Sequence, residues 1–409
     1  MKRRLKVLLL LAAGGVRLAS AQPQSLPLTD GAWELKGPSV KLERYDGRDV
    51  LSVENGFAYR RDVRLQDGTV DFDVQVTRRR SFVYLMFRMA GDGEHEELYL
   101  RPHKSSLPDA IQYAPVYQGA SAWQLYHGPG ATAAVAFEPG VWTHVRLVLW
   151  GEKAAVFVGD LGKPALVIPR LARTAASGYL ALRALAPPGS GSGPVARFAN
   201  VSIQPGASPF DFSSGKRDDA PDQAAPSAPA TRLSPPGSVR AWSVSRAFAV
   251  PKDVAAPALP APDVLGEWKR VEAEPSGLVA LHRYVKLPAA DSREAAAVAR
   301  VRVRADTAGL RRLDLGFSDV ATVFLNGRPL FRADAHYSYD NPRQEGLIHF
   351  GQATVFLPLE KGDNDLAVLV SDEFGGWGLM GRFADTTGLE VTAPGLSRSG
   401  TQPGLRQRE

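Results

Sequence analysis

The chain has 409 residues, of which 44% are hydrophobic and none is cysteine, and its formal net charge is +6. Five of its 49 Lys and Arg residues lie within the first 21 positions, which leaves 44 basic against 43 acidic residues in the rest. A nearly neutral chain lacks the basic surface of nucleic-acid-binding proteins, so this class is not expected. Without cysteine there are no disulfides, and large hydrophobic cores must stabilise the fold.

The N-terminal segment has the features of a secretory signal. A basic start, MKRRLK, leads into an apolar run from Val7 to Val16, and small residues precede Ala21. The run is shorter than the roughly 20 residues that cross a bilayer. We therefore predict cleavage near Ala21, a secreted or periplasmic protein, and no membrane span in the mature chain. An uncleaved anchor is the alternative.

A segment at residues 206–238 divides the rest of the chain. It is dominated by Pro, Ala, Ser and Asp, a composition that cannot bury enough apolar area to offset the entropy of ordering. We predict a disordered linker there, between domains at residues 22–205 and 239–393. A polar tail at 394–409 is predicted to be disordered as well.

Both domains have the alternation of β-strands. Apolar residues occupy every second position in 70–76 and 145–149, the period of half-buried strands. In the second domain, Val301 and Val303 alternate with arginines, and Asn326-Gly327 is a strong hairpin signal. Helical periodicity is almost absent. The fold class predicted is all-β, with two β-sandwich (jelly-roll) domains.

Three strands carry a family resemblance in the first domain. They read GTVDFDVQV (68–76), RSFVYLMFRM (80–89) and VWTHVRLVLW (141–150). Over about residues 28–204 the chain resembles the concanavalin A-like lectin and glucanase superfamily, which includes laminin-G-like modules. This resemblance implies a jelly roll with a surface for a glycan or glycoconjugate. It does not imply a reaction, because the superfamily contains lectins, adhesion modules and hydrolases.

The second domain carries another resemblance at residues 313–378. The stretches LDLGFSDVATVFLNGRPLF and GQATVFLPLEKGDNDLAVLVSDEFGGWG are similar to galactose-binding-like jelly rolls, which accompany β-galactosidases and other glycosidases. Ligands of such domains often bind at loops, which makes Trp377 a candidate ligand residue, with packing under a loop as the alternative. Asp363 and Asp365 could hold a structural calcium ion or form a plain turn.

The search for catalytic carboxylates gives no clear pair. Glycoside hydrolysis needs two carboxylates across the bond, and the E-x-D-x-x-E pattern of jelly-roll glucanases does not occur. The remaining catalytic candidate is Glu97, with Glu96 or Asp109 as its partner. It belongs to an alternative in which the protein is a glycoside hydrolase of the glucanase or keto-disaccharide hydrolase type.

Binding residues are easier to propose. In residues 94–101, alternation places Glu97, Tyr99 and Arg101 on one strand face, where they could grip sugar hydroxyls or form a surface salt-bridge ladder. Arg88 on the preceding strand could extend this face. The segment that follows is rich in aromatic and amide groups, which suit a carbohydrate groove or the covered end of a sandwich. Its candidate ligand residues are Gln112, Tyr113, Trp123 and Tyr126.

Other chemistry finds no support. His95, His103 and His127 lack the spacing of a metal site, and no G-x-S-x-G nucleophile elbow occurs. The sequence indicates no metal and no cofactor apart from the calcium considered above. The leading hypothesis is an exported carbohydrate-binding protein that is not an enzyme. The alternatives are the hydrolase and an adhesion module that binds a protein partner, and the oligomeric state is left open.

Overall fold

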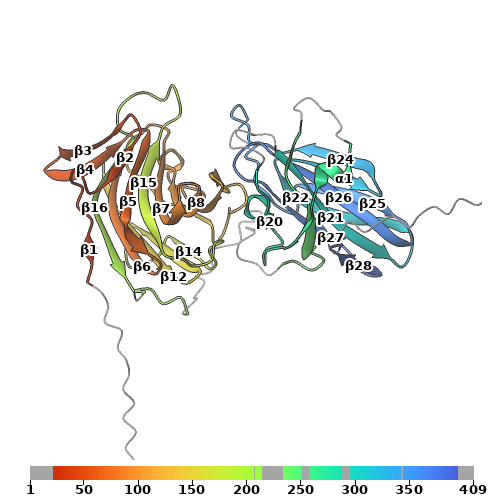
Figure 1. Ribbon diagram of the computed structural model, residues 1–409. Coiled ribbons are helices and arrows are strands. Elements are labelled where there is room, and N and C mark those ends of the chain that lie inside the picture. Colours follow the sequence, from red (N-terminus) through yellow and green to blue (C-terminus); the bar gives the residue numbers. More distant parts are fainter. Residues whose placement is uncertain are drawn as a thin grey trace, which may run out of the picture.

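The computed structural model describes residues 22–206, 208–213, 234–250, 258–287, 295–341 and 344–394 (Figure 1). The predicted signal at 1–21, most of the predicted linker and nearly all of the predicted tail lie outside these residues. Strands dominate the described chain, and they build four sheets. The all-β prediction is confirmed. Helical structure in these ranges is limited to three short elements, η1 (Pro102–Lys104), α1 (Pro262–Leu265) and η2 (Leu281–Arg283).

Two sheets form the first sandwich. In spatial order, sheet A contains β14 (Leu166–Ile168), β13 (Lys153–Val158), β12 (Trp142–Trp150), β6 (Gly68–Val76), β16 (Ala196–Pro205), β4 (Arg48–Val53) and β3 (Val40–Tyr45), with β1 (Gln24–Ser25) beside β16. Sheet B contains β10 (Ala120–Ser121), β9 (Ile111–Tyr117), β8 (Glu94–Leu100), β7 (Phe82–Gly91), β15 (Gly178–Leu185), β5 (Gly56–Leu65) and β2 (Glu34–Lys36), with β11 (Thr132–Ala133) beside β9.

The core of this sandwich lies between the two sheets. Val70 and Phe72 on β6 are fully buried and pair with Leu147 and Val145 of the antiparallel strand β12. The intervening Asp71 is only partly buried. The alternation predicted for these strands is thus the alternation of core and outer faces.

The outer face of sheet A is partly covered by the chain that follows β16. Phe210 packs edge to face on Phe157 at a centroid distance of 5.9 Å, and Phe212 packs on Phe210 at 4.8 Å. At the other end of the predicted linker, the buried Ser234 donates a hydrogen bond to the carbonyl of Pro275 (2.8 Å). The described ends of segment 206–238 therefore pack on the sandwiches, so the disorder predicted there does not apply to them.

Two further sheets form the second sandwich. Sheet D contains β19 (Lys269–Glu272), β17 (Ala241–Val244), β21 (Ala295–Ala305), β26 (Gly362–Asp372), β23 (Val320–Leu325) and β24 (Arg328–Asp334), with β18 (Phe248–Ala249) and β28 (Leu389–Thr392) beside β21. Sheet C contains β20 (Val279–Ala280), β27 (Gly378–Phe383), β22 (Gly309–Ser318) and β25 (Ala353–Leu359).

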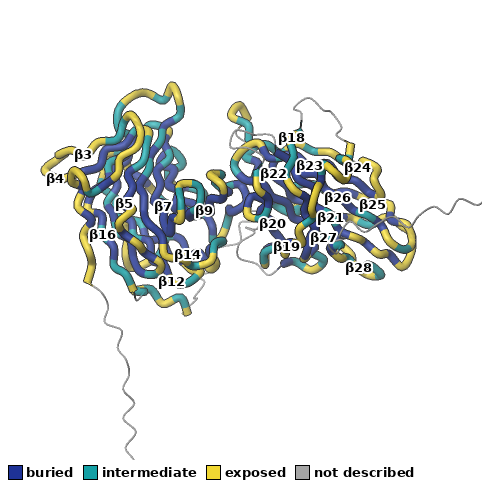
Figure 2. Tube along the Cα trace, viewed as in Figure 1, coloured by how far each residue is buried: buried dark blue, intermediate teal, exposed yellow. Residues whose placement is uncertain are grey.

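The predicted hairpin in this sandwich is present. β23 and β24 are joined by Asn326 and Gly327, with φ values of 52° and 77°. Two consecutive residues with positive φ are the requirement of a type I′ turn, which matches the right-handed twist of the strands. Buried residues fill the interior of both sandwiches (Figure 2).

The two sandwiches contact each other through the segment between β10 and β11. Gln124, which is fully buried, donates its backbone N–H to the carbonyl of Gly375 (3.0 Å) and accepts from the N–H of Ile348 (3.1 Å). Its side-chain amide donates to the carbonyl of Glu345 (3.0 Å) and accepts from the hydroxyl of Ser318 (3.1 Å). One residue of the first sandwich thus makes four hydrogen bonds to the second.

An apolar contact surrounds this residue. Leu278 and Ile348 of the second sandwich belong to the same buried cluster as Leu125 of the first. Beside them, the hydroxyl of the buried Tyr126 donates to a carboxylate oxygen of Glu274 (2.5 Å). Burial raises the pKa of both groups. Buried apolar side chains and hydrogen-bonded polar groups therefore lie side by side at this contact.

Replacing Gln124 by Ala should reduce the free energy of unfolding by about 1–3 kcal/mol, because the Glu345 carbonyl loses its side-chain donor and the Ser318 hydroxyl keeps only the Asp319 carboxylate as an acceptor. Urea denaturation followed by tryptophan fluorescence measures this change. Gln24→Ala, at an exposed residue of β1, is the matched control. Equal stability of the two variants would contradict the role given to Gln124.

A second prediction concerns pH. Burial raises the pKa of Asp319 from its usual value of 3.8 to about 7, although the N–H groups of Glu373 and Phe374 donate to its carboxylate. The unfolded chain therefore releases this proton at lower pH than the folded chain, and stability falls as pH rises from about 4 to 7, by up to about 1.4 kcal/mol per pH unit. Asp319→Asn should remove this part of the decline in unfolding free energy. If the unfolding free energies of the native protein and of Asp319→Asn change with pH in parallel, this prediction is wrong.

Candidate functional site

The register of sheet B places six side chains in one line across its outer face. Directly opposed residues of neighbouring antiparallel strands share a face of the sheet. On β8, Leu98 and Leu100 enter the core. The line passes through the residue between them, so it lies on the outer face of the sheet. We call it the transverse row, and its members, paired in this order, are Lys36, Phe57, Arg183, Tyr84, Tyr99 and Gln112.

Aromatic rings and guanidinium groups contact one another along the row and beside it. The Arg183 guanidinium carbon lies 4.7 Å from the ring centroid of Phe57 and 5.0 Å from that of Tyr84. Tyr84 and Tyr99 stack in parallel with centroids 4.6 Å apart. The guanidinium carbon of Arg101 lies 4.6 Å from the Tyr99 centroid. Cation–π and stacking contacts therefore hold these side chains in fixed positions.

The tyrosines of this face stay protonated at neutral pH. Tyr59, Tyr84, Tyr99 and Tyr179 share one apolar cluster with Met86. Burial raises the pKa of Tyr59 and of Tyr99 to about 12, and that of Tyr84 well above its usual value of 10. Their hydroxyl groups therefore act as neutral hydrogen-bonding groups rather than as anions.

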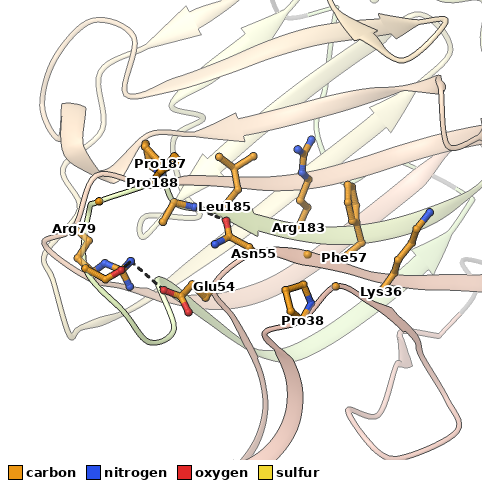
Figure 3. Close-up of a pocket in the computed structure, with 15 residues that line it drawn as sticks. Lys36, Pro38, Glu54, Asn55, Phe57, Arg79, Arg183, Leu185, Pro187 and Pro188 are labelled. Carbon is orange, nitrogen blue, oxygen red and sulfur yellow. Dashed lines mark hydrogen bonds and ion pairs between the residues drawn. The ribbon is translucent and has the colours of Figure 1, made fainter. Parts of the chain in front are cut away.

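A cleft with a volume of about 690 Å³ lies at the Lys36 end of the row (Figure 3). Much of its lining is apolar and includes the ring of Phe57 and the side chain of Leu185. Three further side chains bring hydrogen-bonding groups to it, namely those of Lys36, Asn55 and Arg183. The remaining lining includes Gly37, Pro38, Glu54, Gly56, Arg79, Ala186, Pro187, Pro188, Gly189 and Gly191.

One arginine holds the wall of the cleft. The Arg79 guanidinium donates to the carbonyls of Ser190 (2.9 Å), Gly191 (2.5 Å) and Gly193 (2.5 Å), and it pairs with Glu54 at 3.1 Å. The carboxylate of Glu54 is thereby neutralised. The side-chain oxygen of Asn55 accepts from the N–H of Ala186 (3.0 Å). Loop 186–193 is thus tied to the sheet at several points.

A glycine is required where β5 begins. Gly56 has a φ of +152°, and a Cβ there would lie 2.4 Å from the carbonyl oxygen of Lys36 and 2.4 Å from a methyl carbon of Val40. Any larger residue would push β2 away from β5. The spacing between Lys36 and Phe57 in the cleft depends on this absence of a side chain.

The predicted set on β8 faces outward, as its alternation implies, but it is buried rather than exposed. Glu97, Tyr99 and Arg101 are 2%, 9% and 5% exposed. A carboxylate oxygen of Glu97 accepts from the hydroxyl of Ser121 (2.6 Å), and the other lies 3.7 Å from a ring nitrogen of His95. The three residues therefore form neither an open sugar-binding strip nor a solvated salt-bridge ladder.

Both expected catalytic partners of Glu97 are held by other residues of the protein. Glu96 points to the other side of the strand, where it accepts from the hydroxyl of the core residue Tyr113 (2.7 Å), and burial raises its pKa. Asp109 is held by Arg101 and, at 2.6 Å, by the Lys104 ammonium. Both carboxyl groups are therefore engaged within the protein.

Arg88 has a structural position instead of extending this face. It lies at an irregularity of β7, with a φ of 48°, and is 5% exposed. Its guanidinium donates to the carbonyls of Gln66 (2.8 Å) and Gly151 (2.7 Å), and it pairs with Asp67 at 3.1 Å. The bulge turns the side chain toward the loops at the end of the sandwich.

The predicted aromatic groove is a contact between the sandwiches. Tyr113, Tyr126 and Trp377 are at most 1% exposed and offer no ring face to a ligand. Gln112 is also buried and donates to the carbonyls of Trp123 (2.6 Å) and Tyr126 (2.5 Å). These assignments as ligand residues are therefore corrected: the segment covers the end of the first sandwich, which was the alternative.

Trp123 is the member of this set that is partly exposed. Its ring packs edge to face on Tyr337 at 5.7 Å and on Phe374 at 6.2 Å, both in the second sandwich. Its large surface thus contributes to the contact between the domains. The indole of Trp377 donates to the carbonyl of Val370 (3.0 Å) inside the second core.

The residues of the cleft are not among the candidates that the sequence pattern indicates. Phe57 stands in the mixed stretch FAYRRDVRL and Arg183 in the mainly apolar stretch YLALRAL, and both indicate strands without showing what their faces contact. The signal that the sequence did contain is Arg183, because a charged residue inside an apolar strand must point away from the core.

The calcium considered in the second domain gains no support. The carboxylates of Asp363 and Asp365 pair with Arg302 at 3.9 Å and with Arg300, respectively. Among the residues that the structure describes, no group of three or more His, Asp or Glu is arranged to hold a metal ion. No helix in the same ranges is long and apolar enough to cross a bilayer.

Comparisons with known proteins give a likeness of fold. No family model matches the sequence, and no curated protein matches it. The carbohydrate-binding module CBM66 from Bacillus subtilis is similar over 42% of this chain and 95% of its own, with 13% identity and a TM-score of 0.33.

Two other solved structures give similar values. A Bacillus subtilis protein with a galectin-like fold covers 46% of this chain and 96% of its own, with 13% identity and a TM-score of 0.35. The Bacillus licheniformis β-glucanase covers 47% of this chain and 100% of its own, with 8% identity and a TM-score of 0.35. Each likeness involves less than half of this chain.

Proposed function

We propose that this is an exported protein that binds carbohydrate in the cleft beside the transverse row and does not cleave it. The observation that carries the proposal is the composition of the cleft, in which the partly exposed ring of Phe57 lies among the polar groups of Lys36, Asn55 and Arg183. Sugar rings combine apolar C–H faces with polar edges, and sites of this mixed character suit them. Export rests on the N-terminal sequence.

The dimensions of the site support a sugar ligand. Lys36 and Arg183 flank Phe57 on the two neighbouring strands, so the three residues lie on three consecutive strands. Neighbouring strands are about 4.8 Å apart, which separates the backbones of the two cations by about 10 Å. A single pyranose ring fits over this span, with its edges near the donors.

The rigidity of the cleft also favours binding. The wall is tied down by Arg79, and the side-chain oxygen of Asn55 is occupied by a backbone N–H, which fixes the direction of its amide group. A preorganised site loses less side-chain entropy when a ligand binds.

Hydrolysis is less well supported than binding. Glu97 is buried and engaged by Ser121, and its two expected partners are held elsewhere by Tyr113 and by Arg101 with Lys104. Glycosidases need two carboxylates on opposite sides of the scissile bond. The adhesion alternative, in which the ligand is a protein, would be favoured by a broad apolar patch. The concave cleft with polar edges favours it less.

Phe57→Ala should weaken oligosaccharide binding about fivefold or more, since loss of one stacking ring removes about 1 kcal/mol. Calorimetric titration with plant, microbial and host oligosaccharides measures the affinity. The control is Trp150→Ala, which removes a ring that is 46% exposed on β12 of sheet A. If sugars of the panel bind the native protein and their affinity is unchanged in Phe57→Ala, this cleft is excluded as the site.

The non-catalytic part of the proposal has its own test. Oligosaccharides recovered after titration should be intact, and the heat should stop when the sites are saturated. Assays for new reducing ends check this expectation. Release of reducing ends by the native protein would contradict it, and loss of that release in Glu97→Gln would identify the carboxylate responsible.

A further inference from the structure

Arg183 differs from its neighbours in the groups that surround its guanidinium. Among the residues that the structure describes, its guanidinium makes no hydrogen bond and no ion pair, and its close contacts are the rings of Phe57 and Tyr84. Nearby arginines are satisfied by carboxylates: Arg61 pairs with Glu34 at 2.6 Å, and Arg79 pairs with Glu54 at 3.1 Å. The donors of Arg183 therefore remain available to a ligand.

The environment of Arg183 favours a planar anion. A guanidinium carries five N–H donors in a rigid fork that matches the two oxygens of a carboxylate. The two rings hold the group in place, and the side chain is partly exposed at the cleft. An anion bound there would replace solvent around a cation that is already oriented, so little side-chain entropy would be lost.

The charges around the cleft reinforce this preference. Its lining carboxylate, Glu54, is neutralised by Arg79. The ammonium group of Lys36 is well exposed, and its distance to the carboxylate of Asp92 is long for an ion pair, at 3.8 Å. Figure 3 shows Arg183, Phe57 and Lys36 side by side and projecting in the same direction. With Arg183 and Lys36 on either side of the ring, and with Glu54 paired to Arg79, the lining of the cleft has a positive balance of charge.

We propose that the ligand is an acidic sugar, a uronic acid whose ring lies against Phe57 while its carboxylate pairs with Arg183 and Lys36 adds a second positive charge. This inference rests on the proposed carbohydrate binding and adds the class of sugar. It predicts that the carboxylate dominates selectivity, because hydrogen bonds between charged groups are stronger than those to neutral hydroxyls.

The test compares acidic trisaccharides with their own methyl esters. Trimers of galacturonate, glucuronate and mannuronate, each free and esterified, are titrated calorimetrically into the native protein, Arg183→Gln, Arg183→Lys and Arg64→Gln. Arg64 is the matched control, since it is exposed on β5 and lies over Tyr179 outside the cleft. Thermal unfolding confirms that each variant is folded, and Arg183→Lys retains the charge without the fork.

We expect at least one acid to bind about tenfold or more tightly than its ester. Arg183→Gln should abolish that difference, Arg183→Lys should reduce it, and Arg64→Gln should leave it unchanged. Equal binding of acid and ester, or a preference that survives Arg183→Gln, would overturn the inference. Neutral sugars that bind in a Phe57-dependent manner would then leave the carbohydrate function standing, whereas failure of every sugar would overturn both.

Discussion

The pairing register of sheet B is the constraint on which the candidate site depends. Side chains alternate across a strand, so a slip of β15 by one residue would turn Arg183 toward the core and Leu182 toward the cleft. The register between β15 and β7 shifts once, between Tyr179 and Ala181. Gly178 permits this irregularity, because a Cβ there would lie 2.2 Å from the carbonyl carbon of Arg88. The buried Arg88 then holds the bulged strand against the loops at the end of the sandwich.

Local patterns were sufficient to predict the architecture. The alternation around Phe72 and the Asn326-Gly327 turn each operate within a few residues, and both have the expected structure. The site could not be predicted in the same way. Phe57 and Arg183 become neighbours through pairing of β5 with β15, which are separated by most of the first sandwich in sequence. On β8, alternation correctly gave the face of Glu97 and not its burial, which depends on contacts with other strands.

The aromatic segment after β9 illustrates a different ambiguity. Large rings with polar edges suit a sugar-binding groove and a contact between domains for the same reason, since both bury apolar area beside hydrogen bonds. What decides between them is whether another part of the chain is near. Here the second sandwich supplies Glu274 for Tyr126 and Phe374 for Trp123, so the rings that were candidates for a ligand are used within the protein.

The packing of Phe210 and Phe212 on Phe157 anchors the chain to the first sandwich beyond its last strand, β16. The hydroxyl of Ser234, bound to the carbonyl of Pro275, anchors the chain to the second sandwich in the same way. Because the two sandwiches belong to one chain, each is held at a high effective concentration near the other. The four hydrogen bonds of Gln124 therefore form as an intramolecular association, an advantage that two separate sandwiches in a mixture would lack.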